Sequence, residues 1–231
     1  MTTRKTTRTT KRDRLQIREQ KILLAARAAF ISHGYRGTSM REIAERADMA
    51  EGTLYLYFKN KNDIVRAVVD AHWQRITEDA NAALEGKTGV FAQLEALASY
   101  HLDMMVRNWP LIELSYVLLY TEDKSVSGAM QLKRNYTASF DHVIERARDR
   151  GEIAKEPPTP FLRDLFFGTL EYAARTLVLH NLADKRDKVV GDLINVLRKT
   201  LQTGQRRLDT SRQDRLLKRF ERIARRLERL G

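Results

Sequence analysis

The sequence contains no cysteine, which excludes disulfide bonds and thiol chemistry. It also lacks a long hydrophobic run: a stretch such as YVLLY at 116–120 is far shorter than the roughly 20 residues that a membrane span needs. The cationic N-terminus has no apolar stretch behind it and so does not resemble a secretory signal. We therefore expect a cytoplasmic protein without a membrane partner.

Motifs of catalysis are missing as well. The sequence has no HExxH, no GxSxG and no Walker loop, and its five histidines are scattered along the chain. An isolated histidine is more often a surface or core residue than a base or a metal ligand. We therefore expect no enzymatic activity, no cofactor and no metal site. The five are His33, His72, His101, His142 and His180.

The net charge of +12 is confined to the two ends of the chain. Residues 1–21 hold eight Lys or Arg against two acids, and residues 205–231 hold ten against four. The remaining residues, 22–204, hold 24 cations and 24 anions and are neutral as a whole. Two basic ends on a neutral body favour a polyanionic partner such as nucleic acid. The alternative at this point is that the charge serves solubility alone.

Residues 38–61, TSMREIAERADMAEGTLYLYFKNK, have the pattern of two short helices joined by a tight turn. Ser39 followed by Glu42 forms a capping box, in which each side chain meets the other residue's free backbone N–H. The pattern predicts one helix after this cap, a turn at 48–50 and a second helix over 51–58.

The second of these helices has one inward and one outward face. Leu54 and Phe58 are spaced i, i+4 and are predicted to face the core, together with Ile43 of the first helix. Four residues are left off the core stripe and are free to contact a partner: Gly52, Thr53, Tyr55 and Tyr57.

Elsewhere, apolar residues recur at three- and four-residue spacing, and no window alternates with a period of two over strand length. We predict an all-α fold of about nine helices. Gly34 and Gly151 are expected to end two of them, and Thr159 as N-cap with Pro160 after it to start another. Outside the 38–61 stretch, the expected helices span about 13–33, 61–83, 91–108, 111–120, 128–150, 160–181 and 187–202, with a polar loop at 121–127.

The two basic ends differ in pattern. Residues 1–12 lack apolar residues and are predicted to be a disordered arm, which either reaches DNA beside a reading helix or is a plain solvated tail. Residues 205–231 predict an extra basic amphipathic helix. It would pack on the body, form a short intermolecular coiled coil, or touch nucleic acid or membrane. Its apolar seam is Leu216, Phe220, Ile223, Leu227 and Leu230.

The N-terminal part resembles the DNA-binding domain of the TetR family of transcriptional repressors. GTLYLYFKNK at 52–61 carries most of the resemblance, which covers about the first 65 residues, while the rest matches only in architecture. Between the disordered arm (1–12) and the basic C-terminal helix (205–231), the resemblance implies a three-helix helix-turn-helix domain (13–62) and a larger helical ligand-binding and dimerisation domain (63–204). The supporting residues upstream are Ala26, Phe30, Gly34, Tyr35, Thr38, Ile43, Ala44 and Ala47.

The resemblance also implies that the second short helix lies in the major groove of double-stranded DNA. Two residues depart from the family pattern: Ala50 stands where many members carry a capping serine, and Glu51 where others carry Lys or Gln. We expect Glu51 to contribute specificity, by accepting a hydrogen bond from cytosine N4, more than affinity. By resemblance, Thr38, Tyr57 and Lys61 hold phosphates, Gly52 lets the backbone approach the DNA, Thr53 and Tyr55 reach base edges, and Arg41 contacts a base or phosphate.

A homodimer through helices 160–181 and 187–202 is a further implication of the resemblance. Both helices carry apolar stripes wider than one partner helix needs, which supports the same conclusion. A two-fold dimer would set two recognition helices about one DNA turn apart and bind a near-palindrome. The expected interface residues are Phe166, Leu170, Val190, Ile194 and Leu197.

Members of the family release DNA when a small molecule lodges in the second domain. Aromatic and methionine residues gather there, and they form either an apolar pocket for a flat or lipidic effector or simply the core. FGTLE at 167–171 and GTLYLYFKNK look similar to members that sense long-chain fatty acyl-CoA; sensing of drugs or aromatic compounds is the alternative. The expected lining is Trp73, Tyr100, Met104, Trp109, Tyr116, Tyr120, Tyr136, Phe140 and Phe167.

The sequence thus favours a ligand-responsive repressor of the TetR type. The alternative from another class is a non-specific nucleic-acid-binding or scaffold protein, for which the two basic ends alone would suffice.

Overall fold

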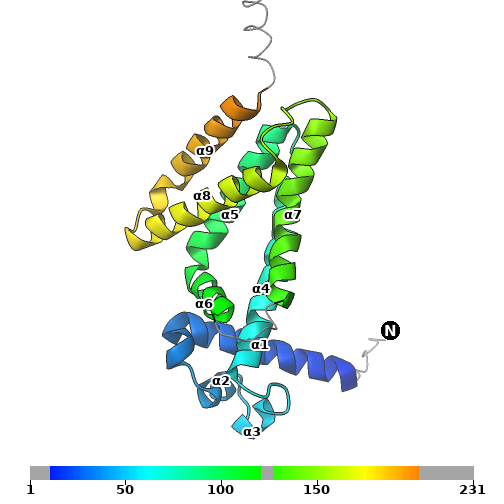
Figure 1. Ribbon diagram of the computed structural model, residues 1–231. Coiled ribbons are helices and arrows are strands. Elements are labelled where there is room, and N and C mark those ends of the chain that lie inside the picture. Colours follow the sequence, from blue (N-terminus) through cyan, green and yellow to red (C-terminus); the bar gives the residue numbers. More distant parts are fainter. Residues whose placement is uncertain (1–10, 121–126, 203–231) are drawn as a thin grey trace, which may run out of the picture.

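The computed structural model describes residues 11–120 and 127–202, with the side chains of 12–115 and 131–202. All regular structure in these ranges is helical, with nine α-helices and one short 3₁₀ helix, which confirms the all-α prediction. Figure 1 shows an elongated molecule, with the first three helices at one end and the last two at the other. Within the described ranges, no helix is long and apolar enough to cross a membrane.

The three N-terminal helices are α1 (Lys11–Gly37), α2 (Met40–Arg46) and α3 (Glu51–Leu54). The backbone of α1 leaves helical geometry at Gly34 (φ 67°), where the sequence predicted a helix end. The predicted second helix over 51–58 is wrong in length, because α3 has four residues. After it the chain continues as a turn, in which the N–H groups of Leu56 and Tyr57 donate to the carbonyls three residues before them.

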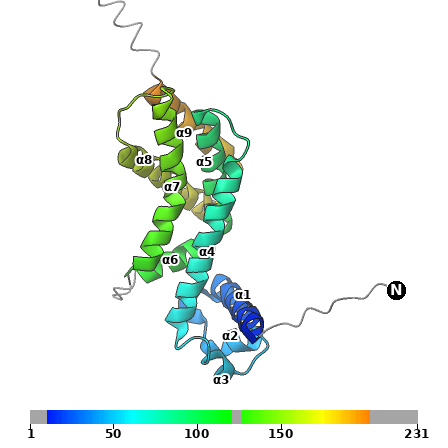
Figure 2. The same cartoon turned by 90° about the vertical axis from the view of Figure 1, so that its right-hand side faces the viewer.

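The remaining helices lie within two residues of their predicted ends. α4 and α7 run side by side, and α5 packs against both α8 and α9 (Figures 1 and 2). The Asn60 side chain accepts from the Asp63 N–H at 3.0 Å and so caps α4 as predicted. The elements are α4 (Lys61–Leu84), α5 (Val90–Arg107), α6 (Trp109–Tyr120), α7 (Ser127–Asp149), α8 (Thr159–Leu179), η2 (Ala183–Lys185) and α9 (Arg186–Leu201).

Two of the predicted caps differ in the structure. Pro158, not Thr159, stands at the N-cap of α8, and the buried Thr159 hydroxyl instead joins the side chains of Arg148 and Glu145. The capping box of α2 is only half formed, since Ser39 accepts from the Glu42 N–H at 3.1 Å. The Glu42 carboxylate instead accepts a hydrogen bond from Arg46 and contacts the ring of His33.

The buried apolar residues form two separate clusters, which we call the head core and the body core. The head core joins α1–α3 to the first part of α4 and to Leu111 and Leu114 of α6, so it does not stop at the predicted boundary after residue 62. The body core fills the space among α4, α5, α7, α8 and α9. Half-buried Trp73 of α4 packs against both.

Some predictions lie outside the described residues. These are the arm up to residue 10, the loop at 121–126 and the basic C-terminal helix over 205–231. Lys11 and Arg12, predicted to be part of the arm, begin α1 instead.

Candidate nucleic-acid interface and internal cavity

The turn between α2 and α3 is fixed by hydrogen bonds that the sequence can make locally. Asp48 takes a left-handed conformation (φ 53°), its N–H donates to the Glu45 carbonyl, and the Met49 N–H donates to the Ala44 carbonyl. This is the Schellman arrangement, with Asp48 in the place that glycine usually fills. The prediction of a turn at 48–50 is therefore confirmed, and the two short helices form a helix-turn-helix.

The head core leaves one face of α3 and the following turn exposed, at the end of the molecule farthest from α8 and α9 (Figure 1). Leu54 and Phe58 are buried, as predicted, while Glu51, Gly52 and Tyr55 are exposed. Thr53 and Tyr57 are half-buried on the same segment. None of the four residues that were predicted to contact a partner is buried, and all four lie on this one short segment.

Leu56 belongs to this exposed set and was missed by the sequence reasoning. Its side chain is 83% exposed, the largest exposed fraction of any bulky apolar residue in the described ranges. Exposing an aliphatic side chain to water is unfavourable unless a partner covers it. Its position between the inward Leu54 and Phe58 was the signal that could have identified it.

Gly52 is not required by the protein's own packing. A Cβ built at this position meets no atom within 4 Å, and the backbone there is helical, so a larger residue fits the fold. Any need for glycine must therefore arise from a partner that approaches the backbone. Ala50 provides no side-chain cap for α3, as the sequence predicted.

Two of the predicted phosphate ligands, Lys61 and Thr38, make contacts within the head. The Lys61 ammonium donates to the carbonyls of Tyr35 and Thr38 at 2.7 Å each, and it lies 4.2 Å from the centre of the Tyr35 ring. Burial lowers the pKa of Lys61. Thr38 is itself buried, and its hydroxyl donates to the Gly34 carbonyl at 2.8 Å. Both residues fix the connection between α1 and α2, whereas Arg41 is exposed and paired with Glu45 at 2.8 Å.

The aromatic residues predicted to line an effector pocket are mostly packed against one another. Tyr136, Phe140 and Phe167 are buried, and their ring centres, with those of Phe166 and His101, lie 4.8–5.9 Å from their neighbours. Trp73 meets the edge of this cluster and Trp109 is half-buried at the border of the body core. Tyr116 and Tyr120 lie on α6, and their side chains are outside the described part of the chain.

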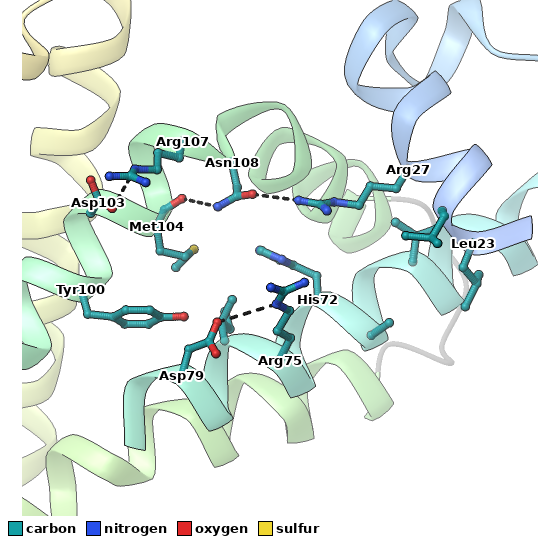
Figure 3. A pocket seen from close by; sticks show the side chains of 14 residues that line it. Leu23, Arg27, His72, Arg75, Asp79, Tyr100, Asp103, Met104, Arg107 and Asn108 are labelled. Carbon is teal, nitrogen blue, oxygen red and sulfur yellow. Dashed lines mark hydrogen bonds and ion pairs between the residues drawn. The ribbon is translucent and has the colours of Figure 1, made fainter. Parts of the chain in front are cut away.

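A cavity of about 380 Å³ does exist, but it lies between α1, α4 and α5 (Figure 3). Tyr100 and Met104 are the two predicted residues that line it. The lining is more polar than predicted, since it also holds charged and amide side chains. These are Arg27 of α1, His72, Arg75 and Asp79 of α4, and Asp103, Arg107 and Asn108 of α5 and its C-cap.

Polar side chains in the cavity tie α1 to the end of α5. Arg27 Nη2 donates to Asn108 Oδ1 at 3.1 Å, and Asn108 Nδ2 donates to the Met104 carbonyl at 2.9 Å (Figure 3). Burial and, to a lesser degree, the guanidinium groups of Arg27 and Arg75 lower the pKa of His72 to about 4. His72 is therefore neutral near pH 7.

The five residues predicted to form the dimer interface do not lie on the surface of the protomer. Phe166, Leu170, Val190, Ile194 and Leu197 are all buried inside the protomer, because α8 and α9 turn these stripes towards α5. The opposite face of the same helices carries exposed apolar residues instead. These are Phe161, Leu165, Tyr172 and Leu179 of α8 and Val196 of α9.

Comparisons with known proteins agree with this geometry. Residues 22–68 match the family described as "Bacterial regulatory proteins, tetR family". The HTH-type transcriptional repressor KstR of Mycolicibacterium smegmatis is 32% identical over 140 residues, which cover 60% of this chain and 67% of that protein. The fatty acid metabolism regulator protein of Bacillus subtilis is 24% identical over 161 residues, covering 69% and 83%.

A solved structure supports the assignment of the fold. The transcriptional regulator FadR from Bacillus subtilis in complex with stearoyl-CoA is similar with a TM-score of 0.67 at 22% identity. The similarity covers 77% of this chain and 96% of that one, so it extends through both the head and the body.

Proposed function

The chain belongs to the tetR family of bacterial regulatory proteins and is thus a DNA-binding transcriptional regulator, and we propose that it acts as a homodimeric repressor. In this proposal the dimer binds a near-palindromic operator through α3 and the following turn. An apolar effector of the long-chain acyl-CoA class releases it. The observation that carries the proposal is the exposed surface of Gly52, Tyr55 and Leu56, which the fold presents outward on a segment anchored by the buried Leu54.

The proposed contacts to DNA follow from what each side chain offers. Gly52 lets the backbone of α3 approach the floor of the major groove, and Thr53 and Tyr55 reach base edges. Leu56 offers an aliphatic contact to a thymine methyl group. Arg41 and Tyr57 contact phosphates, and Glu51 selects for cytosine.

The dimer is supported by the exposed face of α8 and α9. Phe161, Leu165, Tyr172 and Leu179 recur in steps of four and seven along α8, which gives one continuous apolar stripe. Gly168 lies between Leu165 and Tyr172 and has no neighbour within 4 Å of a Cβ, so a second helix has room to approach there. A two-fold pairing of this face carries the two heads on one side of the molecule, as a palindrome requires.

The effector class is supported by the relatives. One relative is named a fatty acid metabolism regulator, and a protein of the same fold was solved with stearoyl-CoA. The aromatic cluster around Tyr136 and Phe167 offers an apolar environment that an alkyl chain would have to open, because in this structure its rings touch.

The test begins with selection of bound sites from random duplex DNA. The selected site is then compared with a scrambled duplex by fluorescence anisotropy in excess competitor DNA. A repressor keeps at least about a 10³-fold preference for its site, whereas a non-specific binder shows only a steep dependence on salt. Loss of all preference would contradict the proposal.

The effector is tested on the same complex. Acyl-CoAs of increasing chain length are added, and release of the labelled operator is followed together with the melting temperature of the free protein. An effector that binds the folded protein must raise its melting temperature. If no chain length releases the operator, the acyl-CoA part of the proposal fails while the DNA-binding part stands.

A further inference from the structure

The head core and the body core do not meet along their whole border. The cavity of about 380 Å³ lies at this border, and its size falls within the roughly 300–1,000 Å³ of small-molecule sites (Figure 3). Leu23 of the head lines one side, and Ile76, Tyr100 and Met104 of the body line the other. A molecule bound here would touch both the DNA-reading head and the body.

The charges in the cavity are not balanced around Arg27. Arg75 lies 3.8 Å from an Asp79 oxygen, and Arg107 lies 2.8 Å from an Asp103 oxygen. Asp103 is paired a second time, with Arg186. Within the described ranges Arg27 has no carboxylate at ion-pair distance, and its hydrogen-bond partner is the neutral amide of Asn108.

His72 offers a second unused polar group. Its Nε2 atom is buried and has no hydrogen-bond partner in the described part of the chain. Figure 3 shows the imidazole at the wall of the cavity, between Arg27 and Arg75, and a ligand reaches its buried Nε2 when Arg27 moves aside. A buried polar atom without a partner is costly, and a ligand that supplies one removes that cost.

We propose that this cavity binds the anionic end of an amphipathic effector, and that the bound anion takes Arg27 away from Asn108. The anion is a carboxylate, as in a free fatty acid, or a phosphate, as in a coenzyme A thioester. Arg27 binds it directly and His72 donates to it from Nε2. The apolar part of the molecule lies against Ile76 and Met104.

The second half of the proposal concerns the tie between α1 and α5. An anion adds the attraction between opposite charges to the hydrogen bond, which the neutral Asn108 amide cannot offer, so an anion competes with Asn108 for Arg27. Releasing the tie lets α1 move relative to α5, and the rest of the head moves with α1 because they share one core. This coupling rests on the proposed function, whereas anion binding itself does not.

Binding of the anion should also raise the pKa of His72. The charged and titratable groups that line the cavity with this imidazole are Arg27 from α1, Arg75 and Asp79 from α4, and Tyr100, Asp103 and Arg107 from α5. In the free protein, burial and the two nearest guanidinium groups favour the neutral ring. A negative charge within about 4–6 Å opposes this effect and raises the pKa of a histidine by about one or more.

The experiment follows His72 in the full-length protein by NMR, with histidine labelled at the ring carbons and His72→Gln used to assign its signal. The pKa of His72 is measured alone and with dodecanoate, dodecanoyl-CoA, coenzyme A or dodecanol. A rise with dodecanoate identifies the carboxylate as the ligand group, and a rise confined to the two coenzyme A compounds identifies the phosphate. No rise with any anion, or an equal rise with dodecanol, would overturn the site.

Two variants test the part played by Arg27. Arg27→Gln should weaken binding of the active probe about tenfold or more, as expected for loss of a charged hydrogen bond. Arg134→Gln, which removes an exposed arginine of α7, is the matched control and should leave binding unchanged. Melting temperatures of both variants establish that they are folded. Equal binding by the two variants would contradict the assignment of Arg27.

Asn108→Asp tests the tie without changing the size of the side chain. The new carboxylate holds Arg27, so the active probe should bind about tenfold more weakly and should release operator DNA less effectively. If the variant binds and responds as the unsubstituted protein does, the tie is not the coupling element. If the probe shifts His72 but never releases DNA, the anion site stands and the proposed effector role fails.

Discussion

The buried histidine of the body, His101, should make the protein less stable as the pH falls from 7.5 to 5.0. The side chain is 6% exposed and lies on α5 among the aromatic rings, with its Nδ1 atom 2.7 Å from the Tyr136 hydroxyl. Burial, with a smaller contribution from Lys133, lowers its pKa to about 3. The native protein therefore keeps the ring neutral throughout this pH range.

The size of the effect follows from the difference between the folded and unfolded states. The pKa of an unfolded histidine is about 6.5, so below that pH the unfolded chain binds a proton that the native protein does not. The stability that the neutral ring gives is fully present above pH 6.5 and is lost as the pH falls towards 3. Each pH unit below 6.5 removes about 1.4 kcal/mol, so about 2 kcal/mol is lost at pH 5.0.

The assay is urea unfolding followed by circular dichroism at both pH values and at one protein concentration, because the stability of the proposed dimer would depend on concentration. His101→Gln removes the titrating ring, so its loss of stability should be smaller by about 2 kcal/mol. His142→Gln, which removes an exposed histidine of α7, is the control and should behave as the unsubstituted protein. If His101→Gln loses as much stability as the unsubstituted protein, the ring does not remain neutral and the reasoning is refuted.

Three further predictions concern the proposed DNA and dimer contacts. Gly52→Ala should weaken operator binding at least about tenfold without lowering the melting temperature, because a Cβ fits the fold and alanine is the better helix former. A lower melting temperature would show that the fold itself needs this glycine. Tyr172→Glu places a charge on the exposed apolar stripe of α8 and should give monomers by light scattering, whereas Arg146→Glu on α7 should not. Deleting residues 1–10 removes three cations. The slope of log K against log salt should fall by up to about 0.9 for each phosphate that the shortened protein no longer neutralises. An unchanged slope would show that this segment does not touch DNA.

The parts of the fold that local chemistry decides were predictable from the sequence. Asn60 caps α4 because its side chain needs only the N–H of a residue three positions later. Gly151 ends α7 in a left-handed conformation for an equally local reason. The length of α3 was not predictable in this way, because burial of Leu54 and Phe58 holds the segment in place whether or not its backbone stays helical.

The dimer residues were misassigned because α8 is apolar on two faces. Phe166 and Leu170 recur with the same helical spacing as Phe161, Leu165 and Tyr172, and periodicity alone does not say which face lies inside. The choice depends on where α5 packs, and that contact joins segments far apart in the sequence. The aromatic residues raised the same difficulty, since a packed cluster and an open pocket have the same composition.

The cavity could not be read from the sequence, because it depends on a contact between residues 81 positions apart, Arg27 and Asn108. Its place nevertheless has a consequence for how a signal reaches the DNA. An effector confined to the aromatic cluster would have to move α1 through the packed side chains of α4 and α5. A ligand that binds Arg27 acts on α1 directly, and Ile22, Ala26 and Phe30 of the same helix are buried in the head core against α2 and α3. Displacing Arg27 would therefore act on the helix that carries the head core, and any shift of α1 must also be accommodated where it packs against α4 and α6.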